Sequence, residues 1–201
     1  MTTPTLYTST TTPYGRLILM IAYLQGIDLS LKFVMPWDNP SELTAISPFS
    51  QVPVLVLETG EVITETPLII QAIAPNVYNT NANYNLPRIS KALGIISQGV
   101  RAYATERFGN EGEPAHPFVK RSKDILINTL PALPTLSADS TEWGDKILLC
   151  ALIWLGIRLP DCFDYLSDDN KQAVNAFKST EIMQKTTAEA LEKQPSHISK
   201  L

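Results

Sequence analysis

The stretch that most constrains the fold is residues 48–66, PFSQVPVLVLETGEVITET. Its PVLVL run is continuously apolar with β-branched members, which is typical of a strand buried on both faces, and Thr59-Gly60 is a two-residue turn signal before EVIT. Thr66 can then cap a helix that has Pro67 at its first position and continues through LIIQAIA. The sequence therefore predicts a β-hairpin that leads directly into a helix N-terminus.

A strand, a helix and a second strand are predicted ahead of this hairpin. PTLYT at 4–8 is a candidate first strand, and IDLSLKFVM has the apolar pattern of another. Between them lies an apolar helix body, LILMIAYLQ, with Thr12 as N-cap, Pro13 as first residue and Gly26 as C-cap. A crossover from strand through helix to strand implies a parallel pair. With a short helical patch at SELTAI the order β-α-β-α-β-β-α is complete, and we expect an α/β domain over residues 1–76.

The rest of the chain is predicted to be helical. An Asn-rich stretch at 75–86 has no periodicity and is interpreted as a linker. Apolar residues spaced three and four apart predict a long helix started by Asn85 and Pro87, then a second helix, and ILLCALIWLGI indicates a buried core helix. These three helices are expected over 86–103, 116–133 and 145–158. With QPSHISKL as an unstructured tail, we expect an all-α domain over residues 86–201.

Composition excludes several classes of protein. The formal net charge of −4 gives no reason to expect nucleic acid or an anionic membrane surface as a partner. The most apolar run has 11 residues, whereas a membrane span needs about 20. Two cysteines, Cys150 and Cys162, and an N-terminus without a signal pattern favour a reduced, cytoplasmic location. His116 and His197 are isolated, so no metal site is expected.

The charge is distributed unevenly along the chain. Residues 1–80 contain two basic side chains, Arg16 and Lys32, and six acidic ones, so this part carries the whole net charge of −4. An anion bound in this part therefore has to be held mainly by backbone N–H groups.

Two motifs make the chain resemble the glutathione S-transferase superfamily over nearly its whole length. SPFSQVPVLVLETGEVITETPLII is similar to the family's Asn-Pro-x-Gly-Lys-Val-Pro-x-Leu, Asp-Gly, Glu-Ser run, with the spacing from Ser47 to Thr66 kept, and TPYGR is similar to its Ser-Pro-x-x-Arg helix start. LIWLGIRLPD resembles the core helix of small bacterial-type members. The resemblance implies an N-terminal thioredoxin-like domain that binds glutathione, a C-terminal helical-bundle domain that helps to bind an electrophile, a homodimer and a role in detoxification.

The resemblance also assigns the core of a glutathione-binding site. In the family the proline that matches Pro53 is cis, and the backbone of the preceding residue, here Val52, pairs with the cysteinyl backbone of glutathione like an added strand. Glu65 and Thr66 match the positions that hold the γ-glutamyl group. They offer a carboxylate for its ammonium, and a hydroxyl with a helix N-terminus for its carboxylate.

The glycyl end of this site departs from the family pattern. The family's Gly is replaced by Ser50 and its Lys by Gln51, so the usual cation for the glycyl carboxylate is missing. Gln51 can still donate through its amide, although a neutral hydrogen bond is weaker than a charge-assisted one. The indole of Trp37 is a further donor for this end.

Several hydroxyls compete for the role of thiolate donor. Glutathione has a thiol pKa of about 8.5, so an enzyme must stabilise the thiolate with a hydroxyl or with the N–H groups of a helix start. Thr12 is the best aligned candidate because it lies four residues before Arg16, and the helix dipole adds positive potential there. Thr12 can equally be a structural N-cap and nothing more. The alternatives as thiolate donor are Ser9, Thr10, Thr11 and Tyr7.

Three further expectations concern the remaining chemistry. STTTP contains no cysteine, so disulfide exchange through a protein thiol is not expected. At the start of the core helix, EWGD keeps Asp145 but has Glu142 where the family commonly has a Ser cap. For the electrophile, the resemblance indicates the first helix of the second domain, whose family counterpart lines the substrate cleft. The candidates on it are Arg101, Tyr103, Arg107 and Phe108.

Three functions compete on these grounds. The first is a glutathione transferase that activates the thiol for attack on a small hydrophobic electrophile. The second is a non-catalytic glutathione-binding or interaction protein of the same fold, which the departures at Thr12, Ser50 and Gln51 favour. The third is a glutathione-dependent isomerase or lyase that uses the same thiolate without net transfer.

Overall fold

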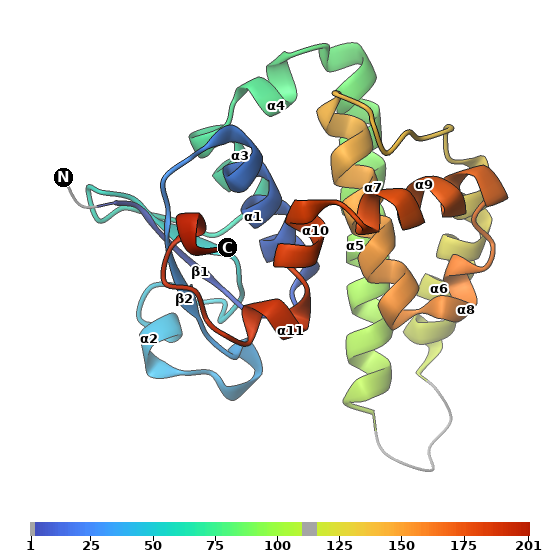
Figure 1. Ribbon diagram of the computed structural model, residues 1–201. Coiled ribbons are helices and arrows are strands. Elements are labelled where there is room, and N and C mark those ends of the chain that lie inside the picture. Colours follow the sequence, from blue (N-terminus) through green and yellow to red (C-terminus); the bar gives the residue numbers. More distant parts are fainter. Residues whose placement is uncertain (1–2, 110–115) are drawn as a thin grey trace. The chain divides into compact units, whose positions relative to one another are not determined.

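The computed structural model describes residues 3–109 and 116–201, and the chain divides into two compact units (Figure 1). Unit 1 consists of Met1–Thr80 together with Thr180–Leu201, and unit 2 of Asn81–Ser179. The predicted domains, 1–76 and 86–201, assign the last part of the chain to the helices. The structure instead groups that part with the α/β unit.

Unit 1 contains a four-stranded sheet with the order β2-β1-β3-β4. The strands are β1 (Thr5–Thr8), β2 (Ser30–Phe33), β3 (Val54–Val56) and β4 (Val62–Ile63). β1 and β2 are parallel, as the predicted crossover requires, and the pairs β1–β3 and β3–β4 are antiparallel. The helices of the N-terminal part are α1 (Pro13–Gln25), η1 (Pro36–Asp38), α2 (Ser41–Thr44), α3 (Thr66–Ile73) and α4 (Asn76–Asn79). The expected thioredoxin-like order is confirmed.

Alternation along the strands gives this sheet two buried faces. Leu6 pairs with Leu31 and Leu55, and all three are buried. Tyr7 and Val54 pair in the next register position and belong to a second cluster that includes Leu43 of α2. Because successive strand residues point to opposite faces, α2 covers the face opposite to the Leu6 layer.

Two details of the predicted hairpin differ in the structure. The connection is a three-residue loop, Glu58–Gly60, because Leu57 N–H donates to Glu61 O at 2.8 Å and Gly60, with φ 89°, ends the loop. α3 begins at Thr66, so Glu65 and not Thr66 holds the N-cap position. A shift of one residue at a helix end is common. Here it means that the Glu65 backbone occupies the N-cap position of α3.

The C-terminal segment of unit 1 is held by a buried arginine. Arg16 of α1 donates from Nε to Thr186 Oγ1 at 3.2 Å and from Nη2 to Met183 O at 2.7 Å. These partners belong to the segment with α10 (Glu181–Lys185), α11 (Ala188–Leu191) and η3 (Ile198–Lys200). A buried guanidinium needs its hydrogen bonds, so the contact keeps this segment on α1.

The last residues are ordered against the sheet, and the predicted unstructured tail is wrong. Leu31 N–H donates to Ser196 O at 3.0 Å and Ile198 N–H donates to Leu29 O at 3.0 Å, so the chain end pairs with the free edge at β2. Ile198 is buried, and His197 Nε2 lies 2.7 Å from Asp28 Oδ1. The two apolar residues of this polar stretch, Ile198 and Leu201, were too weak a signal to predict this pairing.

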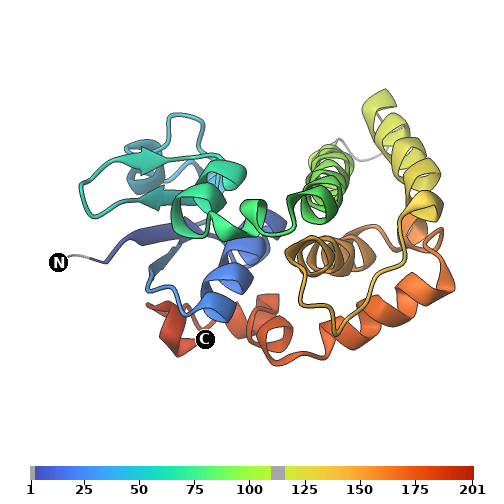
Figure 2. The same cartoon turned by 90° about the horizontal axis from the view of Figure 1, so that it is seen from above.

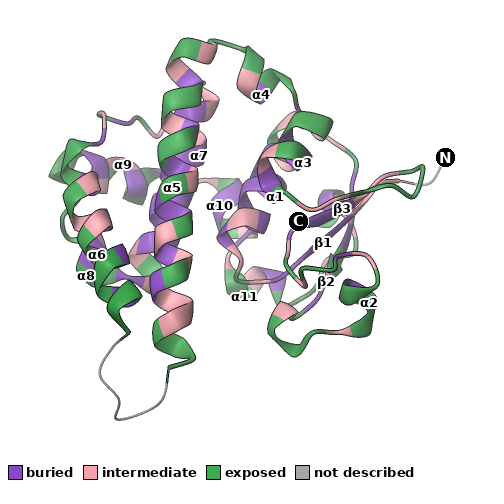
Figure 3. Ribbon diagram, turned by 180° about the vertical axis from the view of Figure 1, so that it is seen from behind, coloured by how far each residue is buried: buried purple, intermediate pink, exposed green. Residues whose placement is uncertain are grey.

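Unit 2 is built around two long helices, α5 (Ala82–Arg107) and α7 (Trp143–Arg158), which lie side by side in the view from above (Figure 2). The other elements are α6 (Pro117–Thr129), η2 (Leu130–Ala132), α8 (Pro160–Phe163) and α9 (Asp168–Lys178). α7 is buried from Ile147 to Leu155, as is α1 along most of its length (Figure 3). No helix of the described residues is long and apolar enough to cross a membrane.

α5 begins earlier than the sequence predicts, at Ala82 instead of around Asn85 and Pro87. Pro87 lies inside the helix, close enough to its start that the lost N–H bond falls in the first turns. Asn85 is fully buried, and its side chain forms hydrogen bonds with the N-terminus of α7 instead of capping α5. The predicted start was wrong because a cap-forming residue type was used for a tertiary contact.

Asn85 caps the N-terminus of α7 from outside that helix. Its Oδ1 accepts the Gly144 N–H at 2.7 Å, and its Nδ2 donates to Glu142 Oε2 at 2.8 Å. Glu142 occupies the N-cap position without a side-chain cap bond of its own. A Cβ on Gly144 would lie 3.0 Å from Asn85 Cα and 2.9 Å from Arg88 Cβ, so the glycine allows this close approach. The Ser cap expected in the family is thus replaced by an amide from α5.

A partly buried ion pair continues this contact one residue further. Arg88 Nε donates to Asp145 Oδ1 at 2.9 Å, and Tyr84 O–H donates to Asp145 Oδ2 at 2.9 Å. The Arg88 guanidinium also stacks 3.6 Å from the centre of the Tyr84 ring. The retained Asp145 therefore joins the first turns of α5 and α7.

We expect Asn85→Ala to lower the free energy of unfolding by about 1–3 kcal/mol, because it leaves the Gly144 N–H buried without an acceptor. Urea denaturation followed by circular dichroism measures the change. Asn83→Ala is the matched control, since Asn83 is exposed on the same turn of α5. Equal stability of the two variants would contradict the capping role.

Candidate functional site

The strand registers bring three predicted site segments to the same end of the sheet, where β1 ends and β3 begins. Tyr7 pairs with Val54 in β1–β3, and Leu55 pairs with Ile63 in β3–β4. Continued past the paired residues, these registers place Pro53 between the end of β1 and Glu65. The residues before α1, the start of β3 and the N-terminus of α3 therefore meet at the same end of unit 1.

The predicted cis peptide bond is present between Val52 and Pro53. Pro53 is buried, while Val52 is partly exposed and packs against the cluster of Tyr7 and Val54. Among the described residues the Val52 backbone makes no turn or loop hydrogen bond. Its N–H and C=O lie beside β3 at the open end of the hairpin.

The N-terminus of α3 presents a carboxylate beside free N–H groups. Glu65 is exposed, Thr66 is buried, and Pro67 follows as a residue without an N–H. The Tyr78 hydroxyl donates to Pro67 O at 3.2 Å, and burial raises the pKa of Tyr78 to about 12. A neutral phenol from α4 therefore stabilises the first turn of α3.

The N-terminus of α1 contains the candidate thiolate donors. Thr12 is the N-cap residue by backbone geometry, but its side chain makes no cap hydrogen bond. Ser9 is buried at the end of β1, and Thr11 is exposed. The hydroxyl of Thr12 is therefore not used in capping, which was the structural alternative for this residue.

Gly15 explains how β1 and α1 come so close at this point, a role that the sequence analysis missed. A Cβ on Gly15 would lie 2.0 Å from Thr8 Oγ1 and 2.6 Å from Thr12 Cγ2. The Thr12 methyl is thus turned towards Gly15, and its hydroxyl occupies another side of Cβ. Thr8 Oγ1 is buried without a hydrogen-bond partner among the described residues.

The loop before Pro53 joins two of the predicted glycyl-end residues. Ser50 has φ 47°, the left-handed conformation that explains why the family has glycine there. Its hydroxyl donates to Pro36 O at 3.4 Å, which ties the residue next to Gln51 to the residue next to Trp37. Gln51 and Trp37 are both exposed.

The two cations of the N-terminal part are used elsewhere. The Arg16 guanidinium donates to Thr186 and Met183, as described above. Lys32 Nζ donates to the Tyr7 hydroxyl at 3.0 Å, and this hydrogen bond raises the pKa of Lys32. Tyr7 is buried with its hydroxyl against Lys32, which makes it a weaker candidate for the thiolate donor than Thr12.

Protein thiols do not contribute to this site. Cys150 and Cys162 are both buried in unit 2, and burial raises the pKa of Cys162 to about 11. No group of three or more His, Cys, Asp or Glu side chains in the described residues can hold a metal ion.

Unit 2 has an aromatic and cationic cluster around Tyr103. Arg107 Nη1 donates to the Tyr103 hydroxyl at 3.0 Å, and Arg107 lies 5.6 Å from the Phe108 ring. Arg158 of α7 lies 5.1 Å from the centre of the Tyr103 ring. The structure thus brings together three predicted electrophile-site residues. It adds Arg158, which sequence analysis missed because its only signal was a cation in the last turn of a helix.

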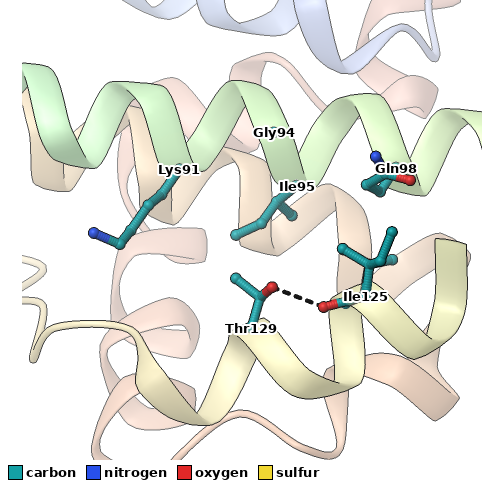
Figure 4. Close-up of a pocket in the computed structure, with 7 residues that line it drawn as sticks. Lys91, Gly94, Ile95, Gln98, Ile125 and Thr129 are labelled. Carbon is teal, nitrogen blue, oxygen red and sulfur yellow. Dashed lines mark hydrogen bonds between the residues drawn. The ribbon is translucent and has the colours of Figure 1, made fainter.

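Unit 2 also has a groove of about 200 Å³ between α5 and α6. Ile95 and Leu126 are its most buried members, and Lys91 and Gln98 lie towards its two ends along α5 (Figure 4). The Thr129 hydroxyl donates to Ile125 O at 2.7 Å, so the hydroxyl is bonded within α6 and the methyl faces the groove. The full lining is Lys91, Gly94, Ile95, Gln98, Ile125, Leu126 and Thr129.

Comparison with known proteins agrees with this geometry. Residues 11–75 match the family model described as glutathione S-transferase, N-terminal domain. No curated protein sequence matches the chain.

Solved structures of bacterial glutathione transferases match nearly the whole chain. A glutathione transferase family member from Pseudomonas fluorescens Pf-5 with bound glutathione is 18% identical, covers 92% of this chain and 98% of its own, and has a TM-score of 0.68. A glutathione S-transferase from Methylobacterium radiotolerans in complex with glutathione sulfonate is 17% identical, with coverage of 92% and 95% and a TM-score of 0.69. One from Methylobacillus flagellatus with glutathione bound is 18% identical, with coverage of 92% and 99% and a TM-score of 0.66.

The family model and the solved structures together match both units. The family model spans the first helix, the cis-proline hairpin and α3, while the solved structures extend the match through the helices of unit 2. The chain therefore has the glutathione S-transferase fold, and its residues 11–75 match the model of that family's N-terminal domain.

Proposed function

We propose that this protein is a glutathione transferase, which activates the glutathione thiol for attack on a small hydrophobic electrophile. The observation that carries the proposal is that the cis Val52-Pro53 bond, the N-terminus of α3 and the segment before α1 lie at the same end of the sheet, with the Thr12 side chain making no cap hydrogen bond. Solved structures of similar fold contain bound glutathione or glutathione sulfonate, which supports glutathione as the co-substrate. A cytoplasmic location and a role in detoxification belong to the same proposal.

The tripeptide is held mostly by backbone groups in this proposal. Val52 offers its N–H and C=O to the cysteinyl residue, in the manner of an added strand. Glu65 accepts from the γ-glutamyl ammonium, and Thr66 with the first N–H groups of α3 donates to the γ-glutamyl carboxylate. Gln51 and Trp37 hold the glycyl carboxylate through neutral donors, because Arg16 and Lys32 are already bonded elsewhere.

Thiol activation is assigned to Thr12. Its hydroxyl is not used in capping, and donation from it to sulfur at the positive end of α1 lowers the pKa of the bound thiol. The thiolate sulfur then forms a bond to the electrophilic carbon while a leaving group departs with its electron pair. The thiol proton is released to solvent before the attack.

We expect Thr12→Ala to lower kcat/KM for 1-chloro-2,4-dinitrobenzene about ten- to hundredfold, because one hydrogen bond to a charged group is lost. The pH midpoint of the same rate should rise by about 1–2 units, because the thiolate is less stabilised. Glutathione affinity measured by calorimetry at a pH below the pKa of the bound thiol, where the thiol is neutral, should be unchanged, and Thr12→Ser should retain activity.

Ser9→Ala and Thr11→Ala are the matched controls for this variant. Full activity of Thr12→Ala together with inactive Ser9→Ala would transfer the role to Ser9. Full activity of all three variants would show that no hydroxyl of this segment stabilises the thiolate.

A non-catalytic glutathione-binding protein is the second candidate function. The exposed, neutral Gln51 favours it, because it stands where the family usually has a cation, and Ser50 beside it replaces the family's glycine. Glutathione binding without conjugation of any aryl halide would support this candidate. Rearrangement or cleavage of a substrate with glutathione recovered unchanged would instead indicate an isomerase or lyase.

We also propose that the protein is a homodimer, with a second copy as the occupant of the α5–α6 groove. Phe49, at 67% exposure, is the most exposed large hydrophobic side chain of the described residues. The groove, of about 200 Å³, offers an apolar floor of Ile95 and Leu126. Burial of Phe49 of one copy in the groove of the other removes both apolar surfaces from water.

We expect Phe49→Ser and Gly94→Arg each to shift the mass in sedimentation equilibrium to that of one chain, 22.2 kDa. Gly94→Arg blocks the groove without harming the helix, since a Cβ at Gly94 meets no atom within 4 Å. Phe118→Ser is the matched control because Phe118 is also exposed but lies outside the groove. A dimer that survives both test variants contradicts this interface.

A further inference from the structure

The ring of Tyr103 has two guanidinium groups within cation–π distance. Arg158 Cζ lies 5.1 Å and Arg107 Cζ 6.0 Å from the ring centre. Tyr103 and Arg107 are one turn apart on α5, and Arg158 ends α7, which packs on α5. Two packed helices therefore bring two positive charges to one aromatic side chain.

The Tyr103 ring is held in place by the core of unit 2. It packs edge-on against Trp154 of α7, with ring centres 6.3 Å apart. Trp154 in turn lies over Gly99, where a Cβ would come within 2.8 Å of the indole. This packing orients the phenol before any ligand is bound, which lowers the entropic cost of binding.

The acidic side chains beside the two arginines are paired with another cation. Lys123 Nζ lies 3.4 Å from Glu106 Oε2 and 3.1 Å from Asp161 Oδ2. Within residues 3–109 and 116–201, neither Arg107 nor Arg158 has a carboxylate partner. An arginine in the last turn of a helix is stabilised by the helix dipole, which accounts for Arg107 and Arg158 separately. The dipole does not explain why both side chains lie against the same ring.

An exposed aromatic side chain adjoins one of the two charges. Phe108 is 56% exposed and lies 5.6 Å from the Arg107 guanidinium. Guanidinium groups match planar carboxylates with paired N–H donors, and aromatic faces match flat apolar groups. The combination suits a ligand with both properties in one molecule.

We propose that the Arg107–Tyr103–Arg158 cluster binds an aromatic carboxylate, with the carboxylate on the guanidinium groups and the ring against Phe108. The inference rests on the proposed function in one respect, since it names this anion as the class of the electrophile. Such a substrate is an aryl halide that carries a carboxylate. The thiolate attacks the carbon bearing the halogen, the C–S bond forms, and the halide leaves.

The first experiment measures binding without chemistry. Isothermal titration calorimetry with 3-nitrobenzoate, which has no leaving group, is expected to give binding that weakens about tenfold or more in Arg107→Gln and in Arg158→Gln. Methyl 3-nitrobenzoate, the uncharged ligand, should bind all variants alike. Arg101→Gln is the matched control because Arg101 is exposed on the same helix outside the cluster. Equal affinity of 3-nitrobenzoate for wild type and both test variants overturns the proposal.

The second experiment measures conjugation of 4-chloro-3-nitrobenzoate and of its methyl ester with glutathione. The ratio of their kcat/KM values is expected to fall about tenfold in each test variant, while the value for the ester stays constant. The ratio is the proper readout, since the two rings differ in intrinsic reactivity.

Failure of the inference and failure of the proposed function give different results. Conjugation of the ester with an unchanged ratio in the variants retains the transferase and rejects the anion site as its electrophile site. Absence of conjugation for both compounds, with arginine-dependent binding of 3-nitrobenzoate, rejects the transferase and retains the anion site. Absence of both rejects both.

Discussion

The pairing of β3 with both of its neighbours is the constraint on which the candidate site depends. β3 is short and central, and its backbone bonds to β1 and β4 determine what lies beside Pro53. A slip of one residue in the β1–β3 register would pair Leu55 with Thr5 or Tyr7 instead of Leu6 and so mix the two faces of the sheet. Because both faces are buried, such a slip is costly, and the site geometry follows from core packing.

Electrostatics in this part of the molecule is governed by where its few cations are bound. Arg16 joins α1 to the C-terminal segment, and Lys32 bonds to Tyr7, so neither is available to a ligand at the sheet edge. Helix N-termini supply the remaining positive potential. A site built in this way depends on helix position more than on side-chain charge, and the hydrogen bond from Tyr78 to Pro67 O helps to hold the first turn of α3.

Much of unit 1 was predictable because its signals are local. Pro13 begins α1 and Gly26 caps its C-terminus, and the apolar run after Pro53 indicates a central strand. The motif around Val52 also indicated the cis bond, which is present. These features need only neighbouring residues, or a family resemblance carried by a contiguous motif.

The features that could not be predicted depend on contacts between distant residues. Asn85 has the chemistry of a cap, but only the packing of α5 on α7 shows which helix it caps. Arg158 looks like an ordinary helix-ending cation until α7 brings it to Tyr103. The roles of Gly15 and Gly144 follow from the atoms opposite them, which a single sequence does not reveal.

The bonds between the chain end and β2 make unit 1 discontinuous in sequence, with unit 2 inserted between its two parts. During synthesis, β2 therefore leaves the ribosome with an open edge that persists until Ser196 and Ile198 have been added. Such an edge is a template for pairing with other chains. The helical unit is therefore synthesised while the sheet of unit 1 still lacks the partner of its β2 edge.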